Sequence, residues 1–125
     1  MGVEARRLRG GTVSTVESFI PAPTVAQRVR YGAALLDEHT PGWAEAVDAL
    51  SLDLSKADQC ILGQLFGTYR KGAQLLYGEN LGRGVYHGFD IDTDDEREDE
   101  EYQAEFEMLT SEWKRLLAER EAVLA

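Results

Sequence analysis

Apolar side chains recur at alternating four- and three-residue steps near the carboxyl end of the chain. This spacing places them on one side of an α-helix, which the sequence predicts from about Asp94 to Val123. Large apolar side chains each contribute about 1.5–3 kcal/mol when buried, so they should decide where this helix lies. We expect them to pack onto the third helix of the same chain, which is predicted to follow Ser55. They are Tyr102, Phe106, Leu109, Trp113, Leu116 and Val123, widened by Leu117 and Leu124, with Arg120 in the one polar position.

Two shorter helices are predicted nearer the start. Thr24 and Gln27 form a capping box, and the helix that follows extends to about Glu38. Thr40 and Pro41 predict the start of the second helix, because threonine can cap free N–H groups and proline fits the first helical position. The expected buried positions are Val25, Val29, Gly32 or Ala33, and Leu36 in the first helix, and Trp43, Val47 and Leu50 in the second.

A third, central helix is predicted after Ser55, which pairs with Asp58 as a capping signal. Gly63, Gly67 and Gly72 lie in its interior, where glycine costs about 1 kcal/mol relative to alanine. Close packing against a neighbouring helix explains them better than a homodimer seam, and residues 32–34 of the first helix are the expected neighbour. The buried-side candidates are Ile61, Leu62, Leu65, Phe66, Tyr69, Ala73 and Leu76.

Prolines and glycines mark the breaks between these elements. The Pro21-Ala22-Pro23 unit ends any regular element, so residues 1–23 are predicted as an arm and linker. The glycine-rich residues 77–90 are predicted as a long loop with a short extended piece from Val85 to Phe89. The predicted fold is all-α: a single helical domain over 24–125, built as a small bundle of about four helices. An extended N-terminal arm precedes it, and the glycine-rich loop precedes a long C-terminal helix.

Composition favours one globular domain. The chain has 125 residues, 43% of them hydrophobic, which is enough to bury a core. Its apolar runs are far shorter than the roughly 20 residues of a membrane-spanning helix, so we expect no membrane partner. The lone Cys60 cannot form an internal disulfide, which favours a reducing cytoplasm.

The net charge of −10 is concentrated in one segment. Residues 90–112 contain twelve acidic residues and one base, Arg97, a local net of −11, so the remainder sums to +1. The spacing partly matches a calcium-binding loop, with carboxylates at five ligand positions. However, Asp95 occupies the position that requires glycine, and Arg97 the position that is normally apolar. These mismatches argue against a metal site. The five carboxylates are those of Asp90, Asp92, Asp94, Glu98 and Glu101.

The same segment has two other interpretations. Asp92, Thr93 or Asp94 caps the last helix, and about four acids favour its positive end, which leaves further carboxylates unexplained. The remainder forms a negative ridge, either simply solvated or presented to a basic partner. The candidate partner-binding residues are Asp95, Glu96, Asp99 and Glu100 on this acidic face, and Arg6, Arg7 and Arg9 in the basic arm.

Residues with catalytic chemistry are few. His39 has a structural explanation at a helix end, and His87 in the glycine-rich loop is the better-placed histidine. Cys60 lies beside apolar residues and is expected to be buried rather than nucleophilic. The chain lacks zinc-ligand spacing, a serine elbow, a phosphate loop and a dinucleotide fingerprint. We therefore expect no catalytic residues, no cofactor and no enzymatic activity.

The segment YGAALLDEHTPGWAEAVDALSLDLSKADQCILGQLFGTYRKG, followed by GFD and an aromatic-rich final helix, resembles a family of small bacteriophage proteins. These are uncharacterised proteins of actinobacterial phages and prophages, which share a GAxLLDE-xxPGW segment, an LDLS turn and a CVLGQ-like segment. The resemblance covers roughly residues 29–90 and, more loosely, the last helix. It implies a phage origin and a bacterial host cytoplasm, but it supplies no activity and no functional residues.

These observations lead us to expect a non-enzymatic interaction protein. Its partner would be a bacterial host or competing-phage macromolecule, engaged in host takeover or in countering a defence. The partner is expected to be a protein, with no direct binding to nucleic acid. The alternative is a structural or assembly protein that forms a homo-oligomer or a minor virion component. The sequence identifies neither the partner nor the oligomeric state, and it does not assign a role to His87.

Overall fold

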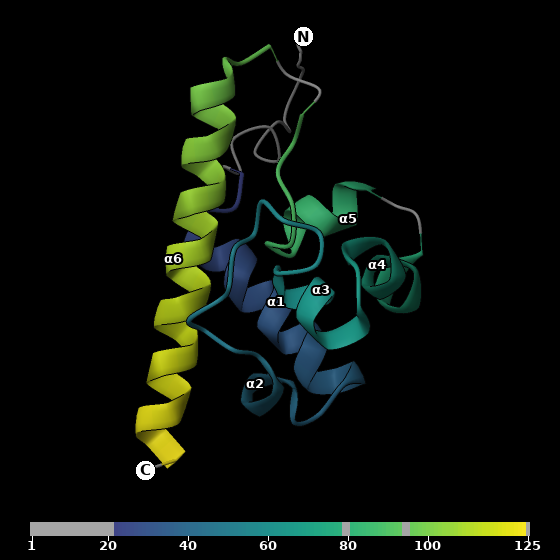
Figure 1. Cartoon of the computed structure of the whole chain (residues 1–125), viewed down its shortest axis with the longest axis vertical. Helices are drawn as coiled ribbons and strands as arrows, with labels where there is room; N and C mark the ends of the chain where they lie inside the picture. Colours follow the sequence, from purple (N-terminus) through teal and green to yellow (C-terminus); the bar gives the residue numbers. More distant parts are fainter. Residues whose placement is uncertain (1–21, 79–80, 94–95, 125) are drawn as a thin grey trace, which may run out of the picture.

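A computed structural model describes residues 22–78, 81–93 and 96–124. Helices are the regular secondary structure of its described part, which contains no strand, and this confirms the all-α prediction. Figure 1 shows a long carboxyl-terminal helix along one side of the molecule and the shorter helices gathered beside it. The predicted arm lies almost wholly outside the described residues. The helices are α1 (Val25–His39), α2 (Trp43–Ala46), α3 (Ile61–Phe66), α4 (Tyr69–Tyr77), α5 (Leu81–Tyr86) and α6 (Asp99–Leu124).

Helix α1 begins as predicted. The Gln27 backbone N–H donates to Thr24 Oγ1 (3.1 Å), and the Thr24 N–H donates to Gln27 Oε1 (2.9 Å), which completes the capping box. Two N–H groups that the helix leaves without a partner are thereby satisfied. The apolar stripe on α1 then becomes buried at Val29, Ala33 and Leu36.

Helix α6 packs against α1, not against the predicted third helix. The reason is Gly32 of α1, where a Cβ atom would lie only 2.9 Å from the Trp113 ring. The absence of a side chain there lets the indole approach the α1 backbone. Trp113 and Leu109 are fully buried, and the Trp113 indole N–H donates to the Gly88 carbonyl (2.8 Å).

The start of α6 was wrongly predicted. The helix begins at Asp99 rather than near Asp94, so Asp92 and Thr93 do not cap it, and Asp94 lies outside the described residues. Arg97 explains why the helix begins later in the chain than predicted. Its guanidinium donates to the Asp92 carbonyl (2.8 Å) and holds the preceding segment against the helix. The Glu98 N–H instead donates to Glu101 Oε1 (2.9 Å), which is one half of a capping box. The stripe is buried or half-buried up to Leu117, but Val123 is 85% exposed.

The predicted third helix is two helices. Gly67, with a φ of +101°, ends α3, and Thr68 caps α4 by accepting from the Lys71 N–H. Cys60, not Ser55, caps α3, since its sulfur accepts from the Gly63 N–H at 3.2 Å. Ser55 instead donates to Asp53 Oδ1 within a turn.

Gly63 and Gly72 are packed inside the chain, as predicted, but their neighbour is not α1, and Gly67 is exposed. A Cβ at Gly63 would lie 2.2 Å from the Ala57 carbonyl, and one at Gly72 would lie 2.7 Å from Leu62. These contacts bring α3 against the preceding turn and α4 against α3. Gly63 and Gly72 therefore allow neighbouring parts of one continuous segment, residues 57–72, to pack closely together.

Two further local predictions were wrong. Helix α2 is a single turn that ends before Val47, and Leu50 is 94% exposed rather than on a buried face. The expected loop at 77–90 contains α5, which includes Val85 instead of leaving it extended. Gly84 in α5 leaves room for the Tyr69 hydroxyl, which would lie 2.5 Å from a Cβ at this position. A search of the described helices finds none both long and apolar enough to cross a bilayer.

Candidate functional site

One carboxylate of the acidic segment belongs to the interior of the fold. Glu105 of α6 accepts from Arg28 Nη1 of α1 at 2.8 Å and from Arg97 Nη1 at 2.6 Å, one arginine on each carboxylate oxygen. The three side chains are only 10–24% exposed. Glu105 therefore joins α1, α6 and the segment that leads into α6.

Arg28 also binds α5 and the segment that follows it. Its Nε donates to the Val85 carbonyl and its Nη2 to the Asp90 carbonyl, both at 2.8 Å. A guanidinium has donors in a rigid fork, so one side chain fixes three separate segments. Sequence reasoning missed Arg28 because a single arginine next to an apolar stripe has no distinguishing pattern. Arg97, the one base within the acidic run, was the available signal for Glu105.

Asp90 points into the protein instead of toward a metal site. Its Oδ1 accepts from the Ile91 N–H (2.8 Å), and burial raises the pKa of this carboxyl above its ordinary value. Tyr69 and Tyr77 line the same region, joined by a hydrogen bond of 3.1 Å between their hydroxyls. Burial, and then the hydrogen bond with Tyr77, raise the pKa of Tyr69. Within the described ranges, no group of three or more His, Cys, Asp or Glu side chains is arranged to hold a metal ion.

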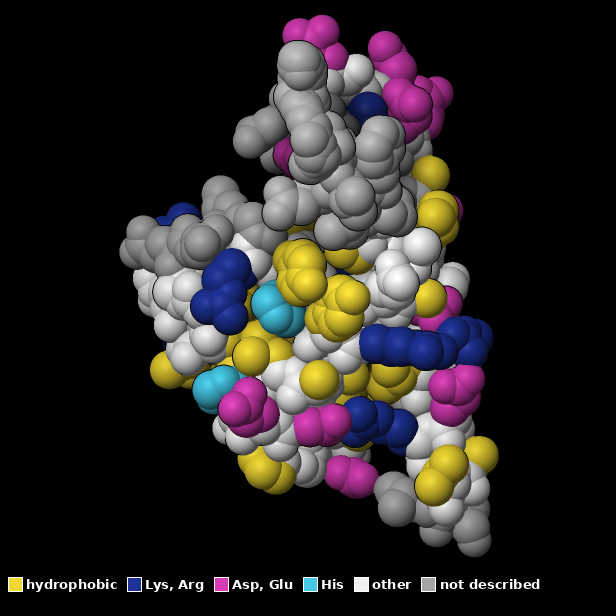
Figure 2. Space-filling view, turned by 180° about the vertical axis from the view of Figure 1, so that it is seen from behind, with side chains coloured by type: hydrophobic (Ala, Val, Ile, Leu, Met, Phe, Trp, Pro, Cys, Tyr) yellow, Lys and Arg dark blue, Asp and Glu magenta, His cyan; other side chains and the backbone are white. Residues whose placement is uncertain are grey.

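The predicted acidic face is exposed where the structure describes it. Glu96, Asp99 and Glu100 are exposed, and none of them forms an ion pair with another described residue. Figure 2 shows acidic side chains gathered at the end of the molecule where α6 begins. Asp95 lies outside the described residues, as do Arg6, Arg7 and Arg9 of the basic arm.

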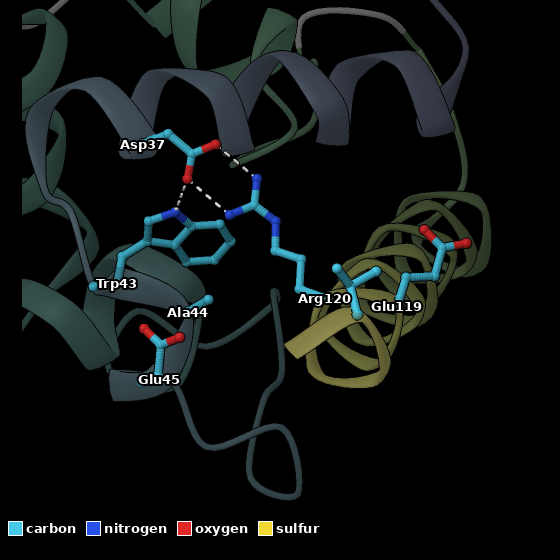
Figure 3. Close-up of a pocket in the computed structure, with 8 residues that line it drawn as sticks. Asp37, Trp43, Ala44, Glu45, Glu119 and Arg120 are labelled. Carbon is cyan, nitrogen blue, oxygen red and sulfur yellow. Dashed lines mark hydrogen bonds and ion pairs between the residues drawn. The ribbon is translucent and has the colours of Figure 1, made fainter. Parts of the chain in front are cut away.

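A cleft of about 490 Å³ lies at the opposite end of α6 (Figure 3). Asp37 of α1 is one of the residues that line it. Its Oδ1 accepts from Trp43 Nε1 at 2.8 Å and from Arg120 Nη1 at 2.7 Å, and its Oδ2 accepts from Arg120 Nη2 at 2.7 Å. The guanidinium carbon of Arg120 lies 5.2 Å from the centroid of the Trp43 ring, within range of a cation–π interaction. Ala44, Glu45, Glu119 and Val123 line the remainder.

This arrangement explains the polar position in the apolar stripe of α6. Two hydrogen bonds from Arg120 lower the pKa of Asp37 below its ordinary value, and Asp37 in turn raises the pKa of Arg120. Both groups thus stay ionised at neutral pH and fix the last turns of α6 against α1. The i, i+7 spacing from Trp113 placed Arg120 on the correct side of the helix, but the sequence did not identify Asp37 as its partner.

The remaining candidate side chains have structural contacts. His87 Nδ1 lies 2.7 Å from the Arg83 carbonyl oxygen, so this nitrogen carries the proton, and the ring packs edge-on against Tyr86. His39 Nε2 lies 3.8 Å from a carboxylate oxygen of Glu38. Cys60 is buried, and burial raises the pKa of its thiol, which disfavours the thiolate needed for nucleophilic attack.

Comparison with protein-family models, with curated proteins and with solved structures found no match to this chain. The side chains themselves are therefore the basis for assigning a function. Two surfaces stand out among the described residues: the acidic face at the start of α6 and the cleft near its end.

Proposed function

We propose that this protein is a non-enzymatic interaction protein of phage origin, acting in the cytoplasm of a bacterial host. It binds a basic surface of a host or competing-phage protein. The acidic face at the start of α6, with Glu96, Asp99 and Glu100 at its described centre, makes the contact. The phage origin and the location follow from the resemblance of residues 29–90 and stand as part of the proposal.

The proposal is supported mainly by a difference within the acidic segment: one carboxylate is paired inside the fold, and others are exposed and unpaired. Glu105 is paired with two arginines, whereas Glu96, Asp99 and Glu100 are exposed and form no ion pair with described residues. No ion pair with a described residue offsets their mutual repulsion. A basic partner would relieve this repulsion and gain from long-range attraction during encounter.

Further support comes from how the chemically versatile side chains are used. Cys60 caps a helix, and Asp37 is paired with Arg120. A catalytic group needs a free proton-transfer or nucleophilic position directed at a substrate. These residues have structural uses instead, which favours binding over catalysis.

The proposal is tested by affinity capture from an actinobacterial lysate, with bound proteins identified by mass spectrometry. The test variant combines Glu96→Gln, Asp99→Asn and Glu100→Gln. A matched control combines Glu38→Gln, Asp58→Asn and Glu107→Gln, which removes three exposed charges elsewhere. We expect a basic protein to be retained by the natural chain and the control, released by moderate salt, and lost with the test variant. Equal retention by all three proteins contradicts the proposal.

The alternative function, a homo-oligomeric assembly or virion component, stays a prediction. Of the glycines considered for a seam, Gly63 and Gly72 are in close contact within the chain, whereas Gly67 is exposed. Met108 and Val123 of α6 are exposed as well. Light scattering over a series of protein concentrations separates the two functions. A monodisperse monomer supports the interaction protein, and a stable oligomer that persists on dilution supports the assembly.

A further inference from the structure

The cleft between α2 and the last turns of α6 is a second surface with a defined composition. Hydrogen bonds connect its lining, because the Asp37 carboxylate accepts from both the Trp43 indole and the Arg120 guanidinium. Figure 3 shows these three groups directed toward one another, with Glu45 on the α2 side and Glu119 on the α6 side. A cleft that is already ordered loses little entropy on binding.

The charge balance of this cleft is negative. Three carboxylates line it, those of Asp37, Glu45 and Glu119, against the single guanidinium of Arg120. Asp37 neutralises Arg120 through two hydrogen bonds, and Glu119 is shared with Arg115 outside the cleft. Glu45 is exposed and forms no ion pair with a described residue. The cleft is therefore complementary to a cation.

The cleft also has an apolar side. Ala44 belongs to its wall, and Val123 is 85% exposed at its rim. A neighbouring hollow of about 240 Å³ shares Ala44, Glu45 and Arg120 with it and continues along α6 to Leu117. Lys114 and Glu121 also line this hollow and add one charge of each sign, so the excess of carboxylates is unchanged. Together the cleft and the hollow form a groove that is longer than one side chain, with apolar surface beside carboxylates. Lysine and arginine match such a surface, since each combines an apolar stem with a charged head.

We infer that this groove docks an amphipathic, basic peptide segment of a partner protein. A lysine or arginine of that segment pairs with Glu45, and an adjacent apolar side chain covers Val123 and Ala44. The inference is independent of the acidic face at the start of α6. Asp99 and Glu119 are separated by 20 helical residues, about 30 Å at 1.5 Å per residue, so binding at the two places is distinguishable.

The test is an NMR titration of the isotope-labelled full chain with a short peptide of alternating lysine and leucine. We expect the resonances of the Trp43 indole N–H and the Val123 amide to shift. The same peptide with glutamate in place of lysine should cause no shift at these positions. The Glu45→Lys variant should bind the lysine peptide about tenfold more weakly, because it places like charges together. The matched control, Glu107→Lys, makes the same charge change on an exposed part of α6 outside the groove.

Three results would overturn the inference. One is the absence of binding by the lysine peptide to the natural chain. Another is a set of shifts confined to residues 96–101, which would support the acidic face and exclude the groove. The third is an equal loss of affinity in Glu45→Lys and Glu107→Lys, which would mean that overall charge alone holds the peptide. Retained dispersion of both indole N–H resonances verifies that each variant is folded. If Glu45→Lys does not fold, Glu45→Gln is used as a milder variant.

Discussion

Glu105 and the group formed by Glu96, Asp99 and Glu100 come from the same acidic segment but differ in environment. Glu105 faces α1, and its side chain is 18% exposed and bound by two arginines. The other three face solvent. Replacing one partner of a buried pair leaves an uncompensated charge, whereas replacing an exposed charge changes little. The same residue type thus maintains the fold in one place and is available to a partner in the other.

The largest effect is expected from Glu105→Ala. It should lower the free energy of unfolding by about 3–5 kcal/mol, because Arg28 and Arg97 then lose their shared carboxylate. Glu107→Ala, an exposed neighbour on the same helix, should change it by less than about 0.5 kcal/mol. Urea denaturation of both variants measures this difference. Similar losses in the two variants would show that Glu105 is not part of the interior.

The next effect concerns the approach of α6 to α1, without which Arg28 and Glu105 would not meet. In Gly32→Ala the new methyl group would lie 2.1 Å from the His87 carbonyl, a backbone atom that is held in a packed turn. We expect a loss of about 1–3 kcal/mol from overpacking. Ala34→Ser adds an atom at an exposed position of the same helix and serves as the control. An unchanged unfolding midpoint for Gly32→Ala would contradict the close contact.

A smaller effect is expected from pH. The folded-state pKa of Asp90 is raised by burial, so the native state binds this proton more tightly than the unfolded chain. Stability attributable to Asp90 should therefore fall as pH rises from the unfolded-state value of 3.8 through the raised folded-state pKa. Asp90→Asn removes this titration and should flatten the stability profile in that window. A profile identical to that of the natural chain would place Asp90 in solvent.

The smallest effect on stability is expected from neutralising the exposed group. Asp99 and Glu100 lie in the first turn of α6, where carboxylates interact favourably with the helix dipole, but their removal also relieves repulsion. The combined Glu96→Gln, Asp99→Asn and Glu100→Gln variant should change the unfolding free energy by less than about 1 kcal/mol. Thermal and urea unfolding check this value. A loss as large as that of Glu105→Ala would assign these carboxylates to the fold.

Secondary structure and buried faces were predicted correctly where a single local pattern in the sequence determines them. The capping box at Thr24 and the stripe through Leu109 and Trp113 gave α1 and the buried face of α6. The helix partner of that face was not predictable, because Gly32, Gly63 and Gly72 all allow close approach. Only the three-dimensional packing assigns Trp113 to Gly32.

The candidate sites show the same limit. Exposure of Asp99 and Glu100 followed from their helical positions opposite Tyr102 and Phe106. Glu96 is exposed as expected, although it precedes the helix. The pairing of Glu105 with Arg28 spans 77 residues, and the pairing of Arg120 with Asp37 spans 83. No spacing rule connects residues so far apart in the chain. The groove near α2 was missed for this reason.

A double-mutant cycle between Arg28 and Glu105 tests the central claim most directly. It compares the unfolding free energies of Arg28→Ala, Glu105→Ala, the double variant and the natural chain. We predict a coupling energy above about 1 kcal/mol, the upper end for exposed ion pairs. A coupling energy near zero would mean that Glu105 behaves like its exposed neighbours, and that the acidic segment is not divided between fold and partner.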